Sequence, residues 1–124
     1  MYTENEISKI ILDIAFDIHT KLGPGLFESV YEEILSYELE DYGLSIKKQQ
    51  GIPVIWNELR LEVGFRADII VEDKVIVEIK AVEALNDVHT AQVLTYLKLS
   101  GCKVGLLLNF HTSSLKNGIK RLMY

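Results

Sequence analysis

The segment Ala67–Ala81 reads A-D-I-I-V-E-D-K-V-I-V-E-I-K-A and joins two aliphatic runs through a short polar interruption. Runs rich in β-branched residues favour extended strands, and Glu72–Lys74 has the length and polarity of a hairpin loop. Side chains alternate between the two faces of a strand. Glu78 and Lys80 are therefore predicted to share one face of the second strand, and two opposite charges on an otherwise aliphatic strand call for a functional explanation.

The register of this hairpin decides whether its acidic residues can act together. A three-residue loop pairs Val71 with Val75 and places Asp68 directly opposite Glu78, whereas a two-residue loop would put Asp68 opposite Val77. Facing carboxylates repel each other at such short range. A bound cation would remove that repulsion, and hard oxygen ligands of this kind suit Mg²⁺ or Mn²⁺.

Lys80 follows Glu78 by two residues, so its ammonium group could orient a water molecule or stabilise charge that develops on a phosphate. The arrangement of Asp68, Glu78 and Lys80 is typical of a metal-dependent phosphodiesterase site. Alternatively, Glu78 and Lys80 could be a solvated ion pair on an exposed edge strand, which is the usual explanation of an E-x-K pattern in a strand.

The rest of the chain predicts an α+β fold. Helical periodicity predicts an amphipathic helix from about residue 7 to 22 that ends at Gly23-Pro24-Gly25, and a second helix over 27–42 that Gly43 caps. Alternating segments then predict an antiparallel meander of short strands at 45–50, 52–56, 60–63, 67–71 and 75–80. A third helix from Asn86 or Asp87 to about Ser100, a strand at 104–109 and a weak terminal helix at 115–122 complete a central mixed sheet flanked by helices.

Composition limits the classes of function. The chain has 124 residues, of which 48% are hydrophobic and 25% charged, which predicts a single folded domain over residues 1–124 with no membrane span. The N-terminus lacks the pattern of a secretory signal, and Cys102 has no partner for a disulfide or a zinc pair, so a reducing cytoplasm is expected.

The formal net charge of −5 argues against a broad basic surface for nucleic acid. If acidic residues cluster in a site that binds a divalent cation, the bound cation would reverse the local negative charge. A small basic patch could still be formed by the remaining cationic residues, namely Lys47, Lys48, Arg60, Arg66, Lys116, Lys120 and Arg121.

Polar residues at helical spacing supply further candidates. Glu28 begins the second helix, where the helix dipole favours an acid, and Tyr31 lies one turn later on the same face. Glu28 could point toward a metal and Tyr31 toward a phosphate, or they could be a helix-terminus acid and a core tyrosine. His89, Gln92 and Tyr96 form one stripe on the third helix, a pattern that is usually solvent-facing. The three histidines have no zinc-binding spacing.

Four segments, taken in order, resemble the GxxExxY family of the PD-(D/E)xK nuclease superfamily. They are Gly25-Leu-Phe-Glu28-Ser-Val-Tyr31, Asp68, Glu78-Ile-Lys80 and Gln92-Val-Leu-Thr-Tyr96. The resemblance extends from the first helix to the last strand. A D…E-x-K pattern is common by chance, whereas G-x-x-E-x-x-Y after an L-G-P-G loop, with Q-x-x-x-Y downstream, is far more specific. Ala67 stands where the superfamily motif carries proline, a position at which the superfamily varies.

The resemblance implies a restriction-endonuclease-like core and a nuclease that uses Mg²⁺ or Mn²⁺. Glu28, Asp68, Glu78 and the backbone of Ile79 would hold the metal, and Lys80 would assist the hydrolytic water. Gln92 and Tyr96 would lie beside the site. Nucleic acid, with DNA expected first, would be the substrate, and a two-fold homodimer would be the default assembly. The alternative is a non-catalytic binding or regulatory module that keeps the nuclease fold and acts through a protein or nucleic-acid partner.

Overall fold

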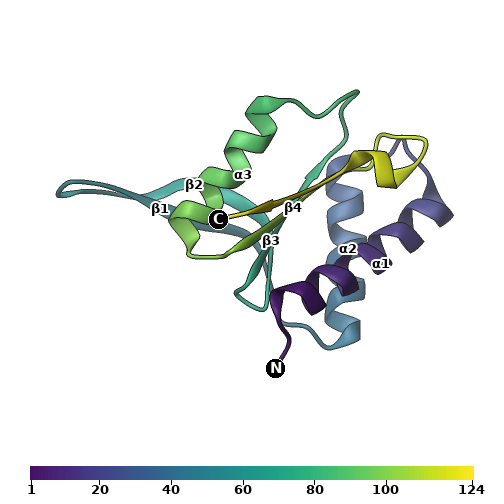
Figure 1. Ribbon diagram of the computed structural model, residues 1–124, viewed down its shortest axis with the longest axis horizontal. Helices are drawn as coiled ribbons and strands as arrows, with labels where there is room; N and C mark the ends of the chain where they lie inside the picture. The colour runs from purple at the N-terminus through teal and green to yellow at the C-terminus, as the bar shows by residue number, and fades with distance from the viewer.

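The computed structural model describes all 124 residues as three helices packed on a five-stranded sheet (Figure 1). The elements are α1 (Glu4–Leu22), α2 (Glu28–Tyr42), β1 (Ile46–Trp56), β2 (Leu59–Val71), β3 (Val75–Lys80), α3 (Asp87–Ser100), β4 (Val104–Asn109), a 3₁₀ turn (Leu115–Gly118) and β5 (Ile119–Met123). The strand order is β1-β2-β3-β4-β5, and only β3 and β4 run parallel. The predicted α+β fold with a mixed sheet is confirmed.

The three helices begin and end close to where the sequence predicts. Thr3 and Glu6 form a reciprocal capping box at the start of α1, and Asn86 accepts two backbone N–H bonds at the start of α3. Gly43 ends α2 with a φ of 106°, in the left-handed region that favours glycine. No helix is long and apolar enough to cross a membrane.

The sheet has a hydrophobic core on each face. Helices α1 and α2 pack on one face over a cluster of 18 buried residues, and α3 packs on the other over a cluster of 10 (Figure 1). Strand β3 alternates as predicted, because Val75, Val77 and Ile79 contribute to the first cluster and Ile76 to the second. Glu78 and Lys80, which share the strand parity of Ile76, therefore lie on the α3 side.

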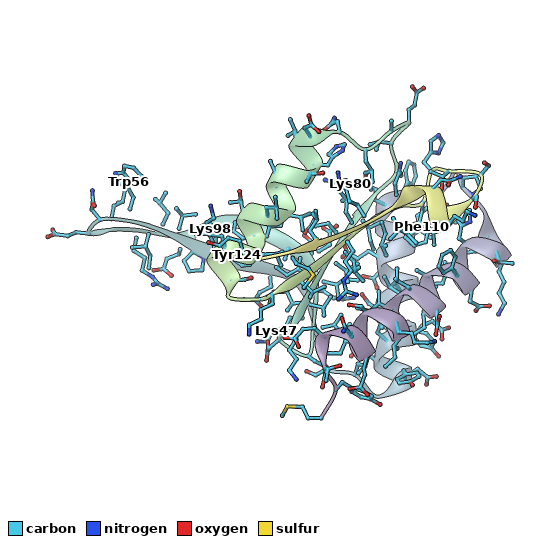
Figure 2. All side chains as sticks on the ribbon, in the orientation of Figure 1. Lys47, Trp56, Lys80, Lys98, Phe110 and Tyr124 are labelled. Atoms are coloured by element: carbon cyan, nitrogen blue, oxygen red, sulfur yellow. The ribbon has the colours of Figure 1, made fainter.

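The first four short strands of the predicted meander are in fact two long ones. Residues 45–50 and 52–56 merge into β1, and 60–63 and 67–71 merge into β2. The strands continue through Gly51 and Gly64, which lie between the predicted segments. At Gly64 a Cβ would collide with the side chain of Val54, so glycine permits a close approach beside the register shift near Pro53. The resulting hairpin arm extends away from the body, with Trp56 near its tip (Figure 2).

The predicted terminal helix at 115–122 is wrong. Leu115, Ile119 and Leu122 have helical spacing, but only a 3₁₀ turn forms, and residues 119–123 continue as β5 antiparallel to β4. Without β5, the backbone groups on that side of β4 would lack sheet partners. The free energy of sheet pairing and of burying Leu122 therefore outweighs a weak local helical preference.

Candidate functional site

A fork between β2 and β3 positions the two strand acids. Of the two registers considered, the structure has the one with a three-residue loop, since Val71 pairs with Val75 and the pairing ends at Ile69 and Val77. Beyond that point β2 continues along β1 while β3 continues along β4. Asp68 and Glu78 are the next residues on either side of the opening, so the fork itself places them opposite each other.

Each of these acids bonds to the backbone of the opposite strand. The N–H of Asp68 donates to Glu78 Oε1 at 3.0 Å, and the N–H of Ile79 donates to Asp68 Oδ2 at 2.8 Å. These bonds replace the backbone ladder where the strands separate and fix both side chains. The acid pair is therefore part of the sheet framework rather than a flexible surface feature.

The surroundings of Glu78 disfavour its charged form. The residue is only 4% exposed, and burial, followed by the nearby Asp68 carboxylate, raises the pKa of Glu78 to about 8. A divalent cation would favour the ionised form of both acids. Mg²⁺ is commonly bound by one or two carboxylates together with water, so the facing pair and the free Oε2 of Glu78 fit such an ion in donor chemistry.

Two further polar residues, Glu32 and Gln49, join this pair, and sequence reasoning missed both. The side-chain amide of Gln49 donates to Glu32 Oε1 at 2.8 Å and to Asp68 Oδ1 at 3.2 Å. Gln49 has a φ of 50° and interrupts the pairing of β1 with β2 opposite Asp68. A left-handed non-glycine residue inside a strand is unusual, and such residues are common where a side chain must be aimed at a functional site.

The sequence contained a signal for Glu32 but not for Gln49. Glu32 follows Glu28 by four residues, so the two acids lie on the same face of α2. Burial and the Asp68 carboxylate raise the pKa of Glu32, which places it in the electrostatic field of the strand pair. Gln49 lies in the polar run Lys-Lys-Gln-Gln, where no pattern distinguishes it from its neighbours.

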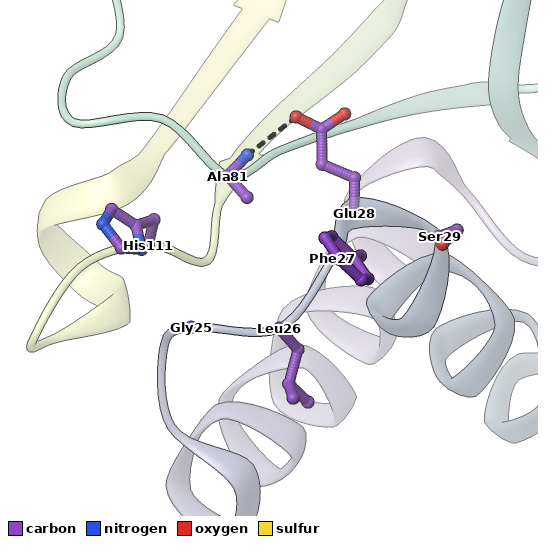
Figure 3. A pocket seen from close by; sticks show the side chains of 7 residues that line it. All are labelled: Gly25, Leu26, Phe27, Glu28, Ser29, Ala81 and His111. Atoms are coloured by element: carbon purple, nitrogen blue, oxygen red, sulfur yellow. Dashed lines mark hydrogen bonds between the residues drawn. The ribbon is translucent and has the colours of Figure 1, made fainter.

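Glu28 approaches the site from α2 but is held apart from the acid pair. Its Oε2 accepts a 3.0 Å hydrogen bond from the N–H of Ala81, directly after β3 (Figure 3). No three His, Cys, Asp or Glu side chains come together as a metal-binding group. The structure thus brings together Asp68 and Glu78, and it places Glu28 beside the residue that follows Lys80.

Tyr31 has a structural role here. It is fully buried and stacks on Phe110, with ring centroids 4.4 Å apart. Its hydroxyl donates to the Gly23 carbonyl at 2.6 Å and accepts from the N–H of Leu26 at 3.2 Å. Of the two interpretations of this tyrosine, the core residue is the one observed, and it fixes the Gly-Pro-Gly loop that leads to Glu28.

The three residues of the predicted stripe on α3 have two different roles. His89 accepts a bond from the N–H of Asn86 and so belongs to the helix cap. Tyr96 is only 8% exposed, and its ring stacks on Phe65 at a centroid distance of 3.9 Å. Burial, Glu78 and Asp68 all raise the pKa of the Tyr96 hydroxyl, so it lies close to the acid pair. Gln92 is exposed and, with Tyr96, lines a cleft of about 420 Å³ between α3 and the hairpin arm.

The cations of the predicted basic patch are partly neutralised. Lys47, Lys48 and Arg60 pair with Asp73, Glu33 and Glu62 at 2.7–2.8 Å. Lys80 is half-buried and forms no ion pair. The positive charge of Lys80 lowers the pKa of Glu78, but burial has the larger and opposite effect. Lys80 therefore interacts electrostatically with the acid pair while no carboxylate is bonded to its ammonium group.

Asn109, at the end of β4, anchors the chain that leaves the site. It is 1% exposed, its amide donates to the Val82 carbonyl at 2.8 Å, and its Oδ1 accepts from the N–H of Val82 and of His111. Asn109 pairs with Lys80 across the parallel strands. The loop after β3 is therefore tied to the loop after β4.

Comparison with known proteins agrees with this geometry. The family model of the PD-(D/E)XK nuclease superfamily matches residues 5–122, and the chain belongs to that superfamily. The five-stranded mixed sheet with helices on both faces is consistent with its restriction-endonuclease-like fold. PD-(D/E)XK nucleases generally depend on a divalent metal. No match was found among curated proteins or among solved structures.

Proposed function

We propose that this protein is a nuclease of the GxxExxY type that hydrolyses phosphodiester bonds of DNA with Mg²⁺ or Mn²⁺. The observation that carries the proposal is the facing pair Asp68 and Glu78 at the fork, with Lys80 two residues beyond on the same side of the sheet. A superfamily that acts on nucleic acid supplies the substrate class.

Asp68, Glu78, the Ile79 carbonyl and, from α2, Glu28 are the proposed metal-holding groups. The bound cation would supply Lewis-acid polarisation of the scissile phosphate and compensate the charge of the acids. Glu78 must lose its proton to take part, and the hydrogen bonds to backbone N–H groups keep both strand carboxylates oriented.

Lys80 is proposed to orient the attacking water and to stabilise negative charge that develops on the phosphate. Its ammonium is not engaged by any carboxylate, so no ion pair has to break first. Tyr96, close to the acid pair, keeps its proton and could donate a hydrogen bond, and the exposed Gln92 lies along the same cleft. Both are proposed to position substrate next to the metal.

The test is cleavage of labelled single-stranded, duplex and branched DNA and of RNA, with Mg²⁺ or Mn²⁺ and with EDTA. We expect cleavage that requires the metal and falls on the order of 10²-fold or more in Lys80→Ala and further in Glu78→Gln. Circular dichroism melts would check that both variants fold. The exposed Lys103→Ala provides a matched lysine control that should retain activity.

The outcomes separate catalysis from a pure binding module. Metal-dependent cleavage that disappears in both site variants supports the nuclease. If wild-type protein cleaves none of these substrates and Mn²⁺ does not raise its melting temperature, the proposal fails, because an ion that binds the folded state must stabilise it. That result would favour a nuclease-fold module that acts through a partner.

A further inference from the structure

The largest hollow on the molecule adjoins the proposed site. It has a volume of about 560 Å³ and is lined by Gly25, Leu26, Phe27, Glu28, Ser29, Ala81 and His111. Figure 3 shows Phe27 and His111 on opposite sides of this hollow, with the Glu28–Ala81 hydrogen bond along its border. The name nucleotide pocket is used for it below.

Two aromatic rings in this pocket are exposed, unlike the buried aromatic residues of the core. Phe27 is 81% exposed, although Tyr31, one helical turn later, is fully buried against Phe110. His111 is also exposed, and its ring nitrogens form no hydrogen bond, in contrast to His19, whose Nε2 bonds the Thr112 carbonyl at 2.8 Å. Planar side chains that are exposed on opposite walls of a hollow provide stacking surfaces.

The backbone that carries each ring is anchored by buried neighbours. Phe27 is the N-cap of α2, directly before Glu28, and the Tyr31 hydroxyl holds the preceding loop through Gly23 and Leu26. His111 follows Phe110 and has its N–H bound to Asn109 Oδ1 at 3.2 Å. The two segments that form opposite walls of the pocket are therefore both tied to the core.

We propose that the nucleotide pocket binds one unpaired nucleotide of a single strand, with its base between Phe27 and His111 and its backbone toward Lys80. The inference rests on the proposed nuclease function and specifies its substrate class. The volume is within the range of small-ligand pockets, on the order of 300–1,000 Å³, and is too small for a base pair with its two backbones. A duplex would have to unpair before its strand could enter.

Charge and position also favour a base over an isolated phosphate in the depth of the pocket. Glu28 is the only charged residue that lines it, and an acid repels a free phosphate but can accept hydrogen bonds from the ring N–H or amino groups of a base. Ala81, to which Glu28 is bonded, directly follows Lys80. A nucleotide in the pocket would thus bring its backbone to the residues proposed for hydrolysis.

The experiment measures binding of a fluorescein-labelled 12-nucleotide oligo(dT) and of a 12-base-pair duplex by anisotropy in EDTA, so that no metal-dependent cleavage contributes. We expect the single strand to bind more tightly than the duplex. Phe27→Ala should weaken single-strand binding by about 5- to 100-fold, the range for loss of one base stack. Phe27→Trp should retain or increase the affinity. Tyr37→Ala, which removes another exposed aromatic on α2 outside the pocket, is the matched control and should bind like wild type.

A second readout reports on the pocket directly. In the double variant Phe27→Trp with Trp56→Phe, the indole at the pocket is the only tryptophan, since Trp56 is the single native one. Its fluorescence should be quenched by oligo(dT) in EDTA, and His111→Ala should reduce that quenching.

Equal affinity for single strand and duplex, or wild-type affinity in Phe27→Ala, would overturn the inference. Failure of the nuclease proposal is a different result, namely absence of cleavage while binding still depends on Phe27.

Discussion

The two strand acids, Asp68 and Glu78, and the two helix acids, Glu28 and Glu32, approach the same end of β3 but are held differently. Each strand acid bonds to the backbone of the opposite strand, and Glu78 is almost fully buried. Glu28 is exposed and bonds to a loop amide, while Glu32 is half-buried and reaches Asp68 only through the side chain of Gln49.

This difference shows that the two pairs of acids depend on the fold to different extents. The strand acids are fixed by the same pairing that forms the sheet, so they keep their places as long as β2 and β3 pair. The helix acids depend on side-chain contacts that can be broken without unfolding the sheet. We therefore expect the strand acids to be indispensable and the helix acids to tune the site.

Substituting one acid from each group should give the largest contrast. Asp68→Asn should reduce metal-dependent cleavage on the order of 10³-fold, because one of the two facing carboxylates loses its charge. Glu28→Gln, which can still accept the Ala81 bond, should reduce it about 10- to 100-fold. Single-turnover cleavage and the Mn²⁺-induced rise in melting temperature would measure both. Equal losses in the two variants would contradict the comparison.

The buried state of Glu78 predicts an unusual pH dependence of stability. The folded protein keeps the Glu78 proton up to about pH 8, whereas a carboxyl of ordinary pKa 4.5 ionises much earlier in the unfolded chain. The folded state then binds more protons between these values, so the free energy of unfolding should fall as pH rises from about 4.5 to about 8. Glu78→Gln should remove this slope and stabilise the metal-free protein at pH 8 by a few kcal/mol, to order of magnitude.

Urea denaturation in EDTA at several pH values would measure this effect. Glu38→Gln, at an exposed position on α2, is the control and should retain the slope of the wild type. A flat pH profile for the wild-type protein would show that Glu78 is ionised in the folded state.

The link between the two groups of acids should matter less than the charge of Asp68. Gln49→Ala removes the amide that bonds both Glu32 and Asp68, so cleavage should fall about 10- to 100-fold through kcat, with KM for the oligonucleotide nearly unchanged. Gln50→Ala is a close control, because that side chain bonds only the Gly51 carbonyl. Equal kcat values in the two variants would show that Gln49 does not position Asp68.

Much of the fold followed from local sequence. Helix boundaries at Gly23, Gly43 and Gly101, a hairpin loop within Glu72–Lys74 and the alternation along β3 were all predicted, because each depends on residues within a few positions of one another. The same local information failed at the C-terminus, where helical spacing suggested a helix and the open edge of β4 imposed a strand.

The site shows the same division. The sequence by itself determined that Glu78 and Lys80 share one face of β3, because the strand period is a local property. It left two loop lengths open, and the structure has the one that sets Asp68 opposite Glu78. Only the tertiary structure decided that Glu32 and Gln49 join the pair, that Tyr31 supports the core, and that Phe27 faces His111 across a pocket. These contacts join residues far apart in the chain, and their geometry depends on how the helices and loops pack around the sheet.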